Sequence, residues 1–446
     1  MVTAGGATDT DRTAVRGWLI ACSVYLLAVL HRTSLGVAGL LAVQRFHIGS
    51  AQLSVFVLVQ LGLYAAGQIP AGLLVDRFGP RRMLLIAAVA MTLAQALFAV
   101  APNFGVALLA RGILGVGDAM TFVSVLRFAA TRLPPRRYPL VVALTGTFGI
   151  VGNMVATFPL AVALRGFGWV PCFATLAGLS AVSFALVYVW LPAPAPRRFA
   201  GGRAAWQAVR VRVTRSVRAS WAVPGTRVGF WTHFTGTSAT TAFGVLWGQP
   251  YLVTAVGMTP ETASLVLLLT VAVSAAGGPT LGALLTRRPA VRVPVALTVG
   301  LVTVVGWLLV LAPARPSAPV VVVVVAFTAL GGPSSMIAFG LARDYNEGTA
   351  VGTATGVVNA AGFLATVVIA LGVGLVLNAL GGQTPAHFRV AMLVLVAVQV
   401  VGIVQLLRWW RRARAYLLVR QARGDVLPVA LRHHRWWDHP VADWRP

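Results

Sequence analysis

Long apolar runs, separated by Pro, Gly and Arg, limit how this chain can fold more than any other feature. A bilayer core about 30 Å thick takes roughly 20 apolar residues per helical crossing. The runs therefore predict an all-α integral membrane protein with twelve transmembrane helices in two six-helix halves. The first run carries no convincing cleavage site and is expected to be an uncleaved helix rather than a signal peptide. The predicted helices are residues 18–41, 52–75, 82–101, 104–127, 138–164, 168–191, 227–251, 260–285, 292–312, 318–342, 349–378 and 386–408.

The composition agrees with a membrane location. Hydrophobic residues make up 58% of the 446 residues and charged residues only 10%, whereas about 25% of an average soluble domain is charged. A water-soluble fold is therefore excluded. All 36 basic residues are Arg, and the lack of Lys excludes Schiff-base and P-loop chemistry.

A long polar segment divides the predicted helices into two sets of six. We expect an N-terminal tail (1–17), a first bundle (18–191), a central loop (192–226), a second bundle (227–408) and a basic C-terminal tail (409–446). The spacing of Arg and apolar residues in the central loop predicts an Arg-rich helix on the membrane surface.

The placement of Arg predicts the orientation, because cytoplasmic loops retain positive charge. Of the 36 Arg, 29 fall on the side of the N-terminus, and only four lie opposite: Arg45, Arg165, Arg315 and Arg389. We therefore expect both termini to be cytoplasmic and the protein to lie in the cell (plasma) membrane. The basic tail could also suggest nucleic-acid binding. However, Trp409 and Trp410 directly follow an apolar helix, where aromatic and Arg side chains suit the lipid headgroup level, so we expect no nucleic-acid partner.

The two halves resemble each other weakly. Gly72 and Gly282 each begin a short loop containing Arg, and Thr145 and Thr355 each precede a Gly; both pairs are 210 residues apart. Equal offsets in separate helical regions favour an internal six-plus-six duplication. Parallel repeats of this kind place a substrate site near the bilayer midplane, between the halves.

The loop after the second predicted helix carries the strongest local motif. It reads Gly72-x-x-x-Asp76-Arg77-x-Gly79-x-Arg81-Arg82 and resembles the corresponding loop of the major facilitator superfamily. The resemblance implies a twelve-helix fold with alternating access, in which this loop serves as a conformational latch. An Asp at a membrane edge can accept hydrogen bonds from a neighbouring helix N-terminus, while Arg81 and Arg82 can hold headgroups or acidic partners.

The fourth predicted helix contains two charged residues, Arg111 and Asp118, seven positions apart. They share a helix face, about 10 Å apart along the axis. Charges at this depth are expensive unless they face a cavity or a partner, which makes both functional candidates. Arg111 is either a substrate-binding group or a structural hydrogen-bonding hub, and Asp118 is a candidate proton carrier.

A second resemblance comes from the first, second and fourth predicted helices. His31-Arg32-Thr-Ser-Leu-Gly-Val-Ala, Tyr64-x-x-x-Gln68-Ile-Pro and Gly-Asp118-Ala together resemble the anion:cation symporter family of major facilitators. The resemblance implies that Arg32 anchors an anionic substrate and that Asp118 takes part in proton coupling. The family often has Asp where this chain has His31. A neutral His cannot neutralise Arg32, but it can titrate itself.

Hydrogen-bonding residues on other helices complete the candidate site. The predicted substrate-binding set is Arg32, Arg111, Tyr64, Gln68, Asn153 and Asn359, and the predicted proton-coupling set is Asp118 and His31. Cys22 and Cys172 are expected to pack in the core. The sequence has no nucleophile elbow, nucleotide loop or metal-ligand spacing, so we expect no enzyme activity, metal or cofactor.

These features predict a secondary transporter that imports a small organic anion with protons. The expected partners are the anionic substrate, protons and the lipid bilayer, and we expect a monomer. An exporter of drugs or metabolites in exchange for protons is the alternative; its Arg residues would be structural and its ligand would bind to hydrophobic walls. A membrane receptor or scaffold without transport is a third reading.

Overall fold

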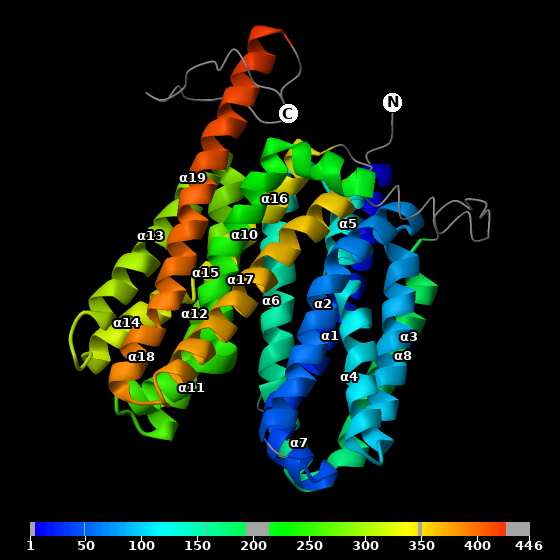
Figure 1. The fold of residues 1–446 in the computed structure, drawn as a ribbon. Coiled ribbons are helices and arrows are strands. Elements are labelled where there is room, and N and C mark those ends of the chain that lie inside the picture. The colour runs from blue at the N-terminus through cyan, green and yellow to red at the C-terminus, as the bar shows by residue number, and fades with distance from the viewer. Residues whose placement is uncertain (1–4, 49, 158, 193–213, 347–349, 425–446) are drawn as a thin grey trace. The chain divides into compact units, whose positions relative to one another are not determined.

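The computed structural model describes residues 5–48, 50–157, 159–192, 214–346 and 350–424. Within these ranges every regular element is a helix (Figure 1). The chain divides into two compact units. Unit 1 comprises Met1–Tyr138, Thr145–Arg218 and Glu347–Gly356, and unit 2 comprises Pro139–Leu144, Ala219–Asn346 and Val357–Pro446.

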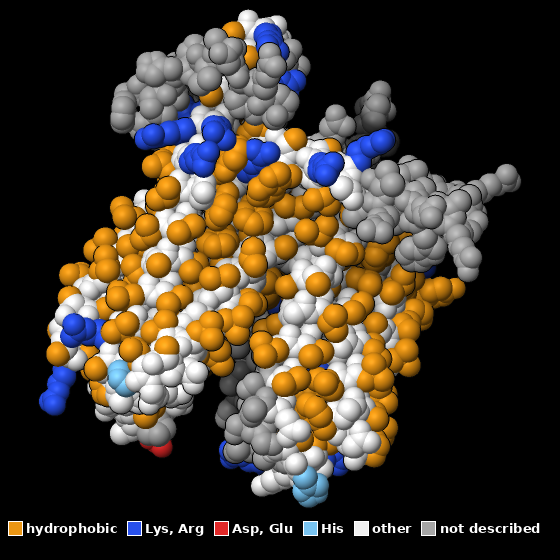
Figure 2. Space-filling model, viewed as in Figure 1, with side chains coloured by type: hydrophobic (Ala, Val, Ile, Leu, Met, Phe, Trp, Pro, Cys, Tyr) orange, Lys and Arg blue, Asp and Glu red, His pale blue; other side chains and the backbone are white. Residues whose placement is uncertain are grey.

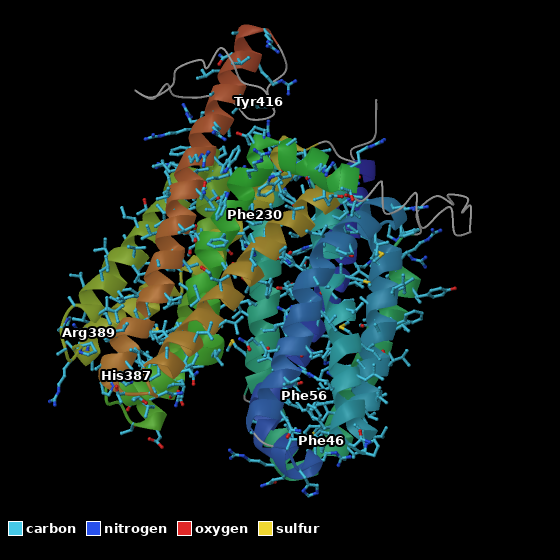
Figure 3. All side chains as sticks on the ribbon, viewed as in Figure 1. Phe46, Phe56, Phe230, His387, Arg389 and Tyr416 are labelled. Atoms are coloured by element: carbon cyan, nitrogen blue, oxygen red, sulfur yellow. The ribbon has the colours of Figure 1, made fainter. Side chains whose placement is uncertain are left out.

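Unit 1 is a bundle whose core is aromatic at one end. Phe46 and Phe56 (Figure 3) have ring centroids 6.2 Å apart, and Phe98 and Trp169 pack with them. Such ring clusters bury large apolar areas and fix the ends of the helices that carry them. The helices are α1 (Gly5–Phe46), α2 (Ser50–Phe78), α3 (Pro80–Val100), α4 (Phe104–Ala119), α5 (Thr121–Arg132), α6 (Tyr138–Thr157), α7 (Pro159–Phe167) and α8 (Trp169–Trp190).

Unit 2 is a second helical bundle with its own core, in which Trp307 contacts the rings of Phe243 and Tyr251. Hydrophobic side chains cover the visible flank of this unit, and Arg side chains gather where α19 extends from it (Figure 2). Its helices are α10 (Pro224–Ala242), α11 (Gly248–Pro250), α12 (Pro260–Arg287), α13 (Arg292–Leu311), α14 (Ala318–Thr328), α15 (Gly331–Ser335), α16 (Ile337–Tyr345), α17 (Val351–Ala379), α18 (Pro385–Ala391) and α19 (Leu393–Ala422). Residues 351–356 of α17 belong to unit 1, and residues 139–144 of α6 belong to unit 2.

Eleven helical segments of the described chain are long and apolar enough to cross a membrane. The predicted helix 227–251 is not among them, because α10 is followed by the π-helical segments Phe243–Trp247 and Tyr251–Ala255. Pro250 between these segments has no N–H to donate, which disfavours a regular α-helix there. Eleven spans and this interrupted segment are consistent with the predicted twelve helices.

The predicted helices 104–127 and 318–342 are also interrupted in the structure. The predicted helix 104–127 consists of α4 and α5, because the N–H of Met120 bonds to the carbonyl of Gly117 and the hydroxyl of Thr121 donates to the carbonyl of Asp118. The predicted helix 318–342 consists of α14, α15 and α16, and the middle piece contains Pro333. Breaks of this kind have local causes, here tighter i→i−3 turns and a missing donor.

The ends of the bundles also differ from the prediction. Helix α1 begins at Gly5, and α19 continues to Ala422 rather than ending at 408. The extension of α19 is rich in Ala, Leu and Arg, which favour helix. Residues 193–213 of the predicted surface helix lie outside the described residues, and 214–222 are largely helical.

Candidate functional site

A buried ion pair joins α1 to α4 in unit 1. Arg32 donates from Nε to Oδ2 of Asp118 (2.7 Å) and from Nη2 to Oδ1 (2.9 Å). The side chain of Asp118 is 0% exposed and that of Arg32 is 18% exposed. Two parallel donors on one carboxylate make a strong and geometrically specific pair. The sequence proposed Arg32 and Asp118 for separate tasks, and the structure brings them into direct contact.

Tyr64 and Gln68 on α2 lie on the buried face of that helix. The guanidinium of Arg32 stacks over the ring of Tyr64, 4.3 Å from its centroid. Gln68, one helical turn further, donates from Nε2 to the carbonyl of Tyr64 (3.3 Å). A cation held between a carboxylate and an aromatic face has a well-defined position, so the head of Arg32 is oriented from two sides.

Arg111 is directed at the backbone of α1. It donates from Nη1 to the carbonyl of His31 (3.2 Å) and from Nη2 to the carbonyl of Arg32 (3.1 Å). A longer contact reaches the hydroxyl of Ser34 (3.4 Å). Arg111 is 1% exposed, and its guanidinium lies over the ring of Phe98. These donors therefore already have acceptors within the protein.

His31 joins α1 to α8. Its Nε2 lies 2.7 Å from the hydroxyl of Ser180, and that hydroxyl also lies 3.2 Å from the carbonyl of Leu176. The ring is 0% exposed, and Nδ1 has no hydrogen-bond partner among the described residues. His31 and Arg32 thus point to different helices.

Among the described contacts of this cluster, basic side chains outnumber acidic ones. Arg32 and Arg111 carry two guanidinium groups, and Asp118 supplies one carboxylate. The acceptors of Arg111 are two carbonyls and a hydroxyl, which are neutral. A net positive charge in a buried, low-dielectric environment favours binding of an anion over binding of a cation.

Asp76 binds the first turn of α17 through three hydrogen bonds. Its carboxylate accepts from the N–H of Gly352 (2.8 Å), the N–H of Thr353 (2.6 Å) and the hydroxyl of Thr353 (2.9 Å). Arg127 on α5 contacts the same carboxylate, with Nε 3.1 Å from Oδ1. A carboxylate at a helix N-terminus satisfies otherwise unpaired N–H groups and interacts favourably with the helix dipole.

The motif predicted as a loop is helical except at Gly79, because α2 continues to Phe78 and α3 begins at Pro80. Its two glycines have steric roles. A Cβ at Gly72 would collide with the carbonyl oxygen of Gly352, so a larger residue would keep α2 from approaching α17. Gly79 has φ 80°, a conformation that other residues rarely adopt, and it precedes Pro80 at the start of α3. The tight turn between α2 and α3 therefore requires glycine.

The three Arg residues of this motif lie in different surroundings. Arg81 donates from Nη2 to the carbonyl of Tyr188 at the end of α8 (2.7 Å) and lies over the Tyr188 ring. It therefore contacts a carbonyl and a ring of α8. Arg77 is exposed beside the ring of Phe78, and Arg82 is half-buried.

The two remaining predicted substrate-binding residues are Asn153 and Asn359. Asn153 is half-buried on α6 in unit 1. Asn359 is 3% exposed on the part of α17 that belongs to unit 2. Cys22 and Cys172 are free and buried, in agreement with core packing. The described residues contain no cluster of His, Cys, Asp or Glu that could hold a metal ion.

Sequence reasoning missed several partners. Arg127, Thr353 and Ser180 contact Asp76 or His31 from helices distant in sequence, and no local spacing predicts such pairings. In unit 2, Asp344 at the end of α16 accepts from Nη1 of Arg292 at the start of α13 (2.5 Å). Acidic residues are rare in this chain, so the presence of Asp344 next to a predicted helix could have marked it as a candidate ion-pair partner.

Comparison with known proteins identifies the family. A family model described as Major Facilitator Superfamily matches residues 21–249, just over half of the chain. The chain belongs to the Major Facilitator Superfamily. It is therefore a multi-pass membrane transporter of that superfamily and not an enzyme.

Solved structures of major facilitators share the fold. The proton:xylose symporter XylE, bound to 6-bromo-6-deoxy-D-glucose, matches with a TM-score of 0.66 and 16% identity over 90% of this chain and 96% of its own. The transporter FucP in its outward conformation has a TM-score of 0.64 at 16% identity, covering 88% of this chain and 99% of its own. Likeness at this identity concerns the fold alone.

A sequence relative comes from Cupriavidus necator. The protein, named as a probable sulfoacetate transporter, SauU, is 24% identical over 171 residues. The match spans 38% of this chain and only 40% of the relative's length.

Proposed function

We propose that this major facilitator imports a small organic anion together with protons, and that the anion competes with Asp118 for Arg32. The bidentate contact between Arg32 and Asp118 carries the proposal. A carboxylate or sulfonate presents two oxygens in the same arrangement as Asp118 does. The substrate can therefore replace the aspartate oxygen for oxygen at the Arg32 guanidinium.

The exchange couples the anion to a proton. Breaking a buried ion pair by removing one partner costs about 3–5 kcal/mol, because the other charge is left uncompensated. Asp118 can leave Arg32 at low cost only when it takes up a proton and when the substrate takes its place. Neither event alone is favourable, so proton and anion bind together.

Two further observations support an anionic substrate. Arg32, Arg111 and Asp118 leave a net positive charge in the interior of unit 1, and the C. necator relative is named for the transport of a sulfonate. We take sulfoacetate as the first probe because its two oxygen-rich groups fit this chemistry.

Arg111 and His31 are proposed to position α1 for this exchange. Arg111 holds the backbone carbonyls of His31 and Arg32, and the His31 ring contacts Ser180 on α8. These contacts fix the segment from which the Arg32 side chain projects. Tyr64, Gln68, Asn153 and Asn359 remain candidate substrate contacts.

The junction of α2 and α3 is proposed as a conformational latch; Gly72, Asp76 and Arg77 lie in α2, Gly79 forms the turn, and Arg81 and Arg82 lie in the first turn of α3. Three hydrogen bonds from the start of α17 to Asp76 support this role, because they form or break as a unit when the helix end moves. With Arg concentrated on the N-terminal side, we propose a plasma-membrane location, cytoplasmic termini and a monomeric transporter.

Uptake into proteoliposomes tests the proposed function. We expect sulfoacetate to accumulate in vesicles containing the purified protein when an inward proton gradient is imposed, and a protonophore to abolish the accumulation. A set of small carboxylates and sulfonates should be assayed in parallel. Extrusion of lipophilic cations without uptake of any anion would contradict import and favour the exporter.

A further inference from the structure

A second buried histidine, His233 on α10, lies in unit 2 and takes no part in the contacts described so far. It is 2% exposed. Its ring packs edge-to-face on Phe339 of α16, with centroids 4.9 Å apart. The imidazole edge faces α17, because a Cβ at Gly362 would lie 2.8 Å from Nε2. Three helices therefore enclose this ring.

The surroundings of His233 determine which nitrogen can titrate. Its Nδ1 lies 3.4 Å from the carbonyl oxygen of Ser335 and 3.4 Å from the hydroxyl of Thr237. A carbonyl only accepts hydrogen bonds, so Nδ1 carries the proton in the contact with Ser335. The Nε2 atom is buried, and the neutral side chain of Asn359 is a hydrogen-bonding neighbour of the ring. A second proton can therefore bind only at Nε2.

No charged group of the described residues faces this ring. Helices α13, α15, α16 and α19 pack against α10, and α17 approaches it at Gly362, beside the His233 ring. Neither α15 nor α17 carries a titratable residue. The titratable residues of the other three are Arg292 on α13, Arg343, Asp344 and Tyr345 on α16, and Arg408, Arg411, Arg412, Arg414, Tyr416 and Arg420 on α19.

These groups are engaged or distant along their helices. Asp344 is paired with Arg292 and lies five residues beyond Phe339, roughly 7 Å along α16. Arg227, on α10 itself, lies six residues before His233, roughly 9 Å along the axis, and its guanidinium stacks on Trp221 and Trp409. The side chain of Asn359, which lies beside the ring, is neutral. An imidazolium formed here has no counter-ion supplied by the described residues.

We propose that His233 takes up a proton at Nε2 when an anion binds beside it, so that the anion is the counter-ion of the imidazolium. A buried charge without a partner is strongly disfavoured. Protonation without the anion is therefore unfavourable, and the anion in turn is stabilised by the protonated ring. The inference rests on the proposed anionic substrate, and it adds a second proton-binding group to Asp118.

Proton uptake on binding tests this assignment. Purified full-length protein is titrated with sulfoacetate by calorimetry in two buffers of different ionisation enthalpy, which gives the number of protons taken up per bound anion. His233→Gln is expected to lower this number by about one, since a glutamine cannot titrate. The matched control is His387→Gln. His387 lies at the α18 end of unit 2 (Figure 3), where its Nδ1 is 2.9 Å from the carbonyl of Gly382, and this change is expected to leave proton uptake as in the wild type.

A spectroscopic measurement on the wild-type protein tests the same assignment without the His233→Gln variant. In wild-type protein with ¹⁵N-labelled histidine, sulfoacetate should convert one buried imidazole from the Nδ1–H tautomer to the doubly protonated form. Binding with the same proton uptake in His233→Gln, or no such conversion, would overturn the assignment of His233 alone. Failure of the wild type to bind sulfoacetate or any other small carboxylate or sulfonate would overturn the proposed function and this inference with it.

Discussion

At the scale of single residues, Arg32 and Arg111 differ in what their guanidinium groups contact. Arg32 contacts an acid and a ring, whereas Arg111 contacts backbone carbonyls. The sequence could predict that both lie within apolar helices, where charges are rare and mark candidate functional residues. It could not separate their roles, since Arg32 and Asp118 are 86 positions apart and their contact depends on the packing of α1 on α4.

Arg32→Lys should weaken anion binding even though it keeps the positive charge. An ammonium is a point charge that cannot reproduce two parallel donors. Losing a hydrogen bond to a charged group costs about 1.5–3 kcal/mol, which corresponds to roughly a ten- to hundredfold weaker Kd. Calorimetric titration of Arg32→Lys and Arg32→Ala with sulfoacetate measures this loss. Wild-type affinity in Arg32→Ala would rule out Arg32 as the anion anchor.

Arg111→Lys should lower thermal stability as well as affinity. Lysine keeps the charge but cannot donate from two nitrogens to the carbonyls of His31 and Arg32, so at least one hydrogen bond from a charged group is lost, worth about 1.5–3 kcal/mol. Arg32→Lys keeps those contacts and should unfold closer to the wild-type temperature. Thermal unfolding of both variants in detergent distinguishes them. A stable Arg111→Lys protein with lost binding would instead mark Arg111 as a direct substrate contact.

At the scale of elements, the end of α2 is joined to the first turn of α17 by the hydrogen bonds of Asp76. The motif predicted that Asp76 could meet a helix N-terminus but not which one, because the donors come from Gly352 and Thr353, more than 270 positions away. The helix breaks after α4 and around α15 were also beyond prediction. They depend on local backbone hydrogen bonds rather than on hydrophobic periodicity.

Asp76→Asn should leave the protein folded and slow its transport. The amide keeps one acceptor oxygen but loses the charge that binds Arg127 and the N-terminus of α17, an interaction with the helix dipole of about 0.3–1 kcal/mol in itself. The balance between conformations should therefore shift. Labelling of single cysteines placed on either side of the membrane reports that balance.

Asp344→Asn is the matched control for this change. It breaks the ion pair with the side chain of Arg292 in unit 2, whereas Asp76→Asn weakens hydrogen bonds from the backbone N–H groups of α17. We expect lower thermal stability with an unaltered labelling ratio. If Asp76→Asn also left both the labelling ratio and the transport rate unaltered, the proposal that Asp76 is part of a conformational latch would be contradicted.

At the scale of the whole molecule, the two units repeat one packing arrangement. Gly72 in unit 1 packs against Gly352 at the start of α17, and Gly282 in unit 2 packs against Ala143 near the start of α6. The sequence offset of 210 residues predicted the repeated loops, and the helix count followed from the apolar runs. The assignment of residues 139–144 to unit 2 and of residues 347–356 to unit 1 was not predictable. Hydropathy shows where helices lie in the sequence but not which other helices their ends contact.

The predicted orientation can be tested on intact cells. Single cysteines introduced in the N-terminal tail and beside Arg423 should react with a membrane-impermeant thiol reagent only after the cells are permeabilised, since Arg is concentrated on that side. A cysteine beside Arg315 should react without permeabilisation. The reverse pattern would invert the topology.

The pH dependence of anion binding to Asp118→Asn tests the exchange at Arg32 most directly. The amide cannot compete as a charged partner for Arg32 and cannot take up a proton, so we expect sulfoacetate to bind Asp118→Asn at least as tightly as the wild type at pH 8. The slope of log Kd against pH should fall by about one, because that slope counts the protons taken up on binding. An Asp118→Asn protein that folds but binds sulfoacetate more weakly than the wild type at pH 8, or binds it with an unchanged slope, would contradict the account.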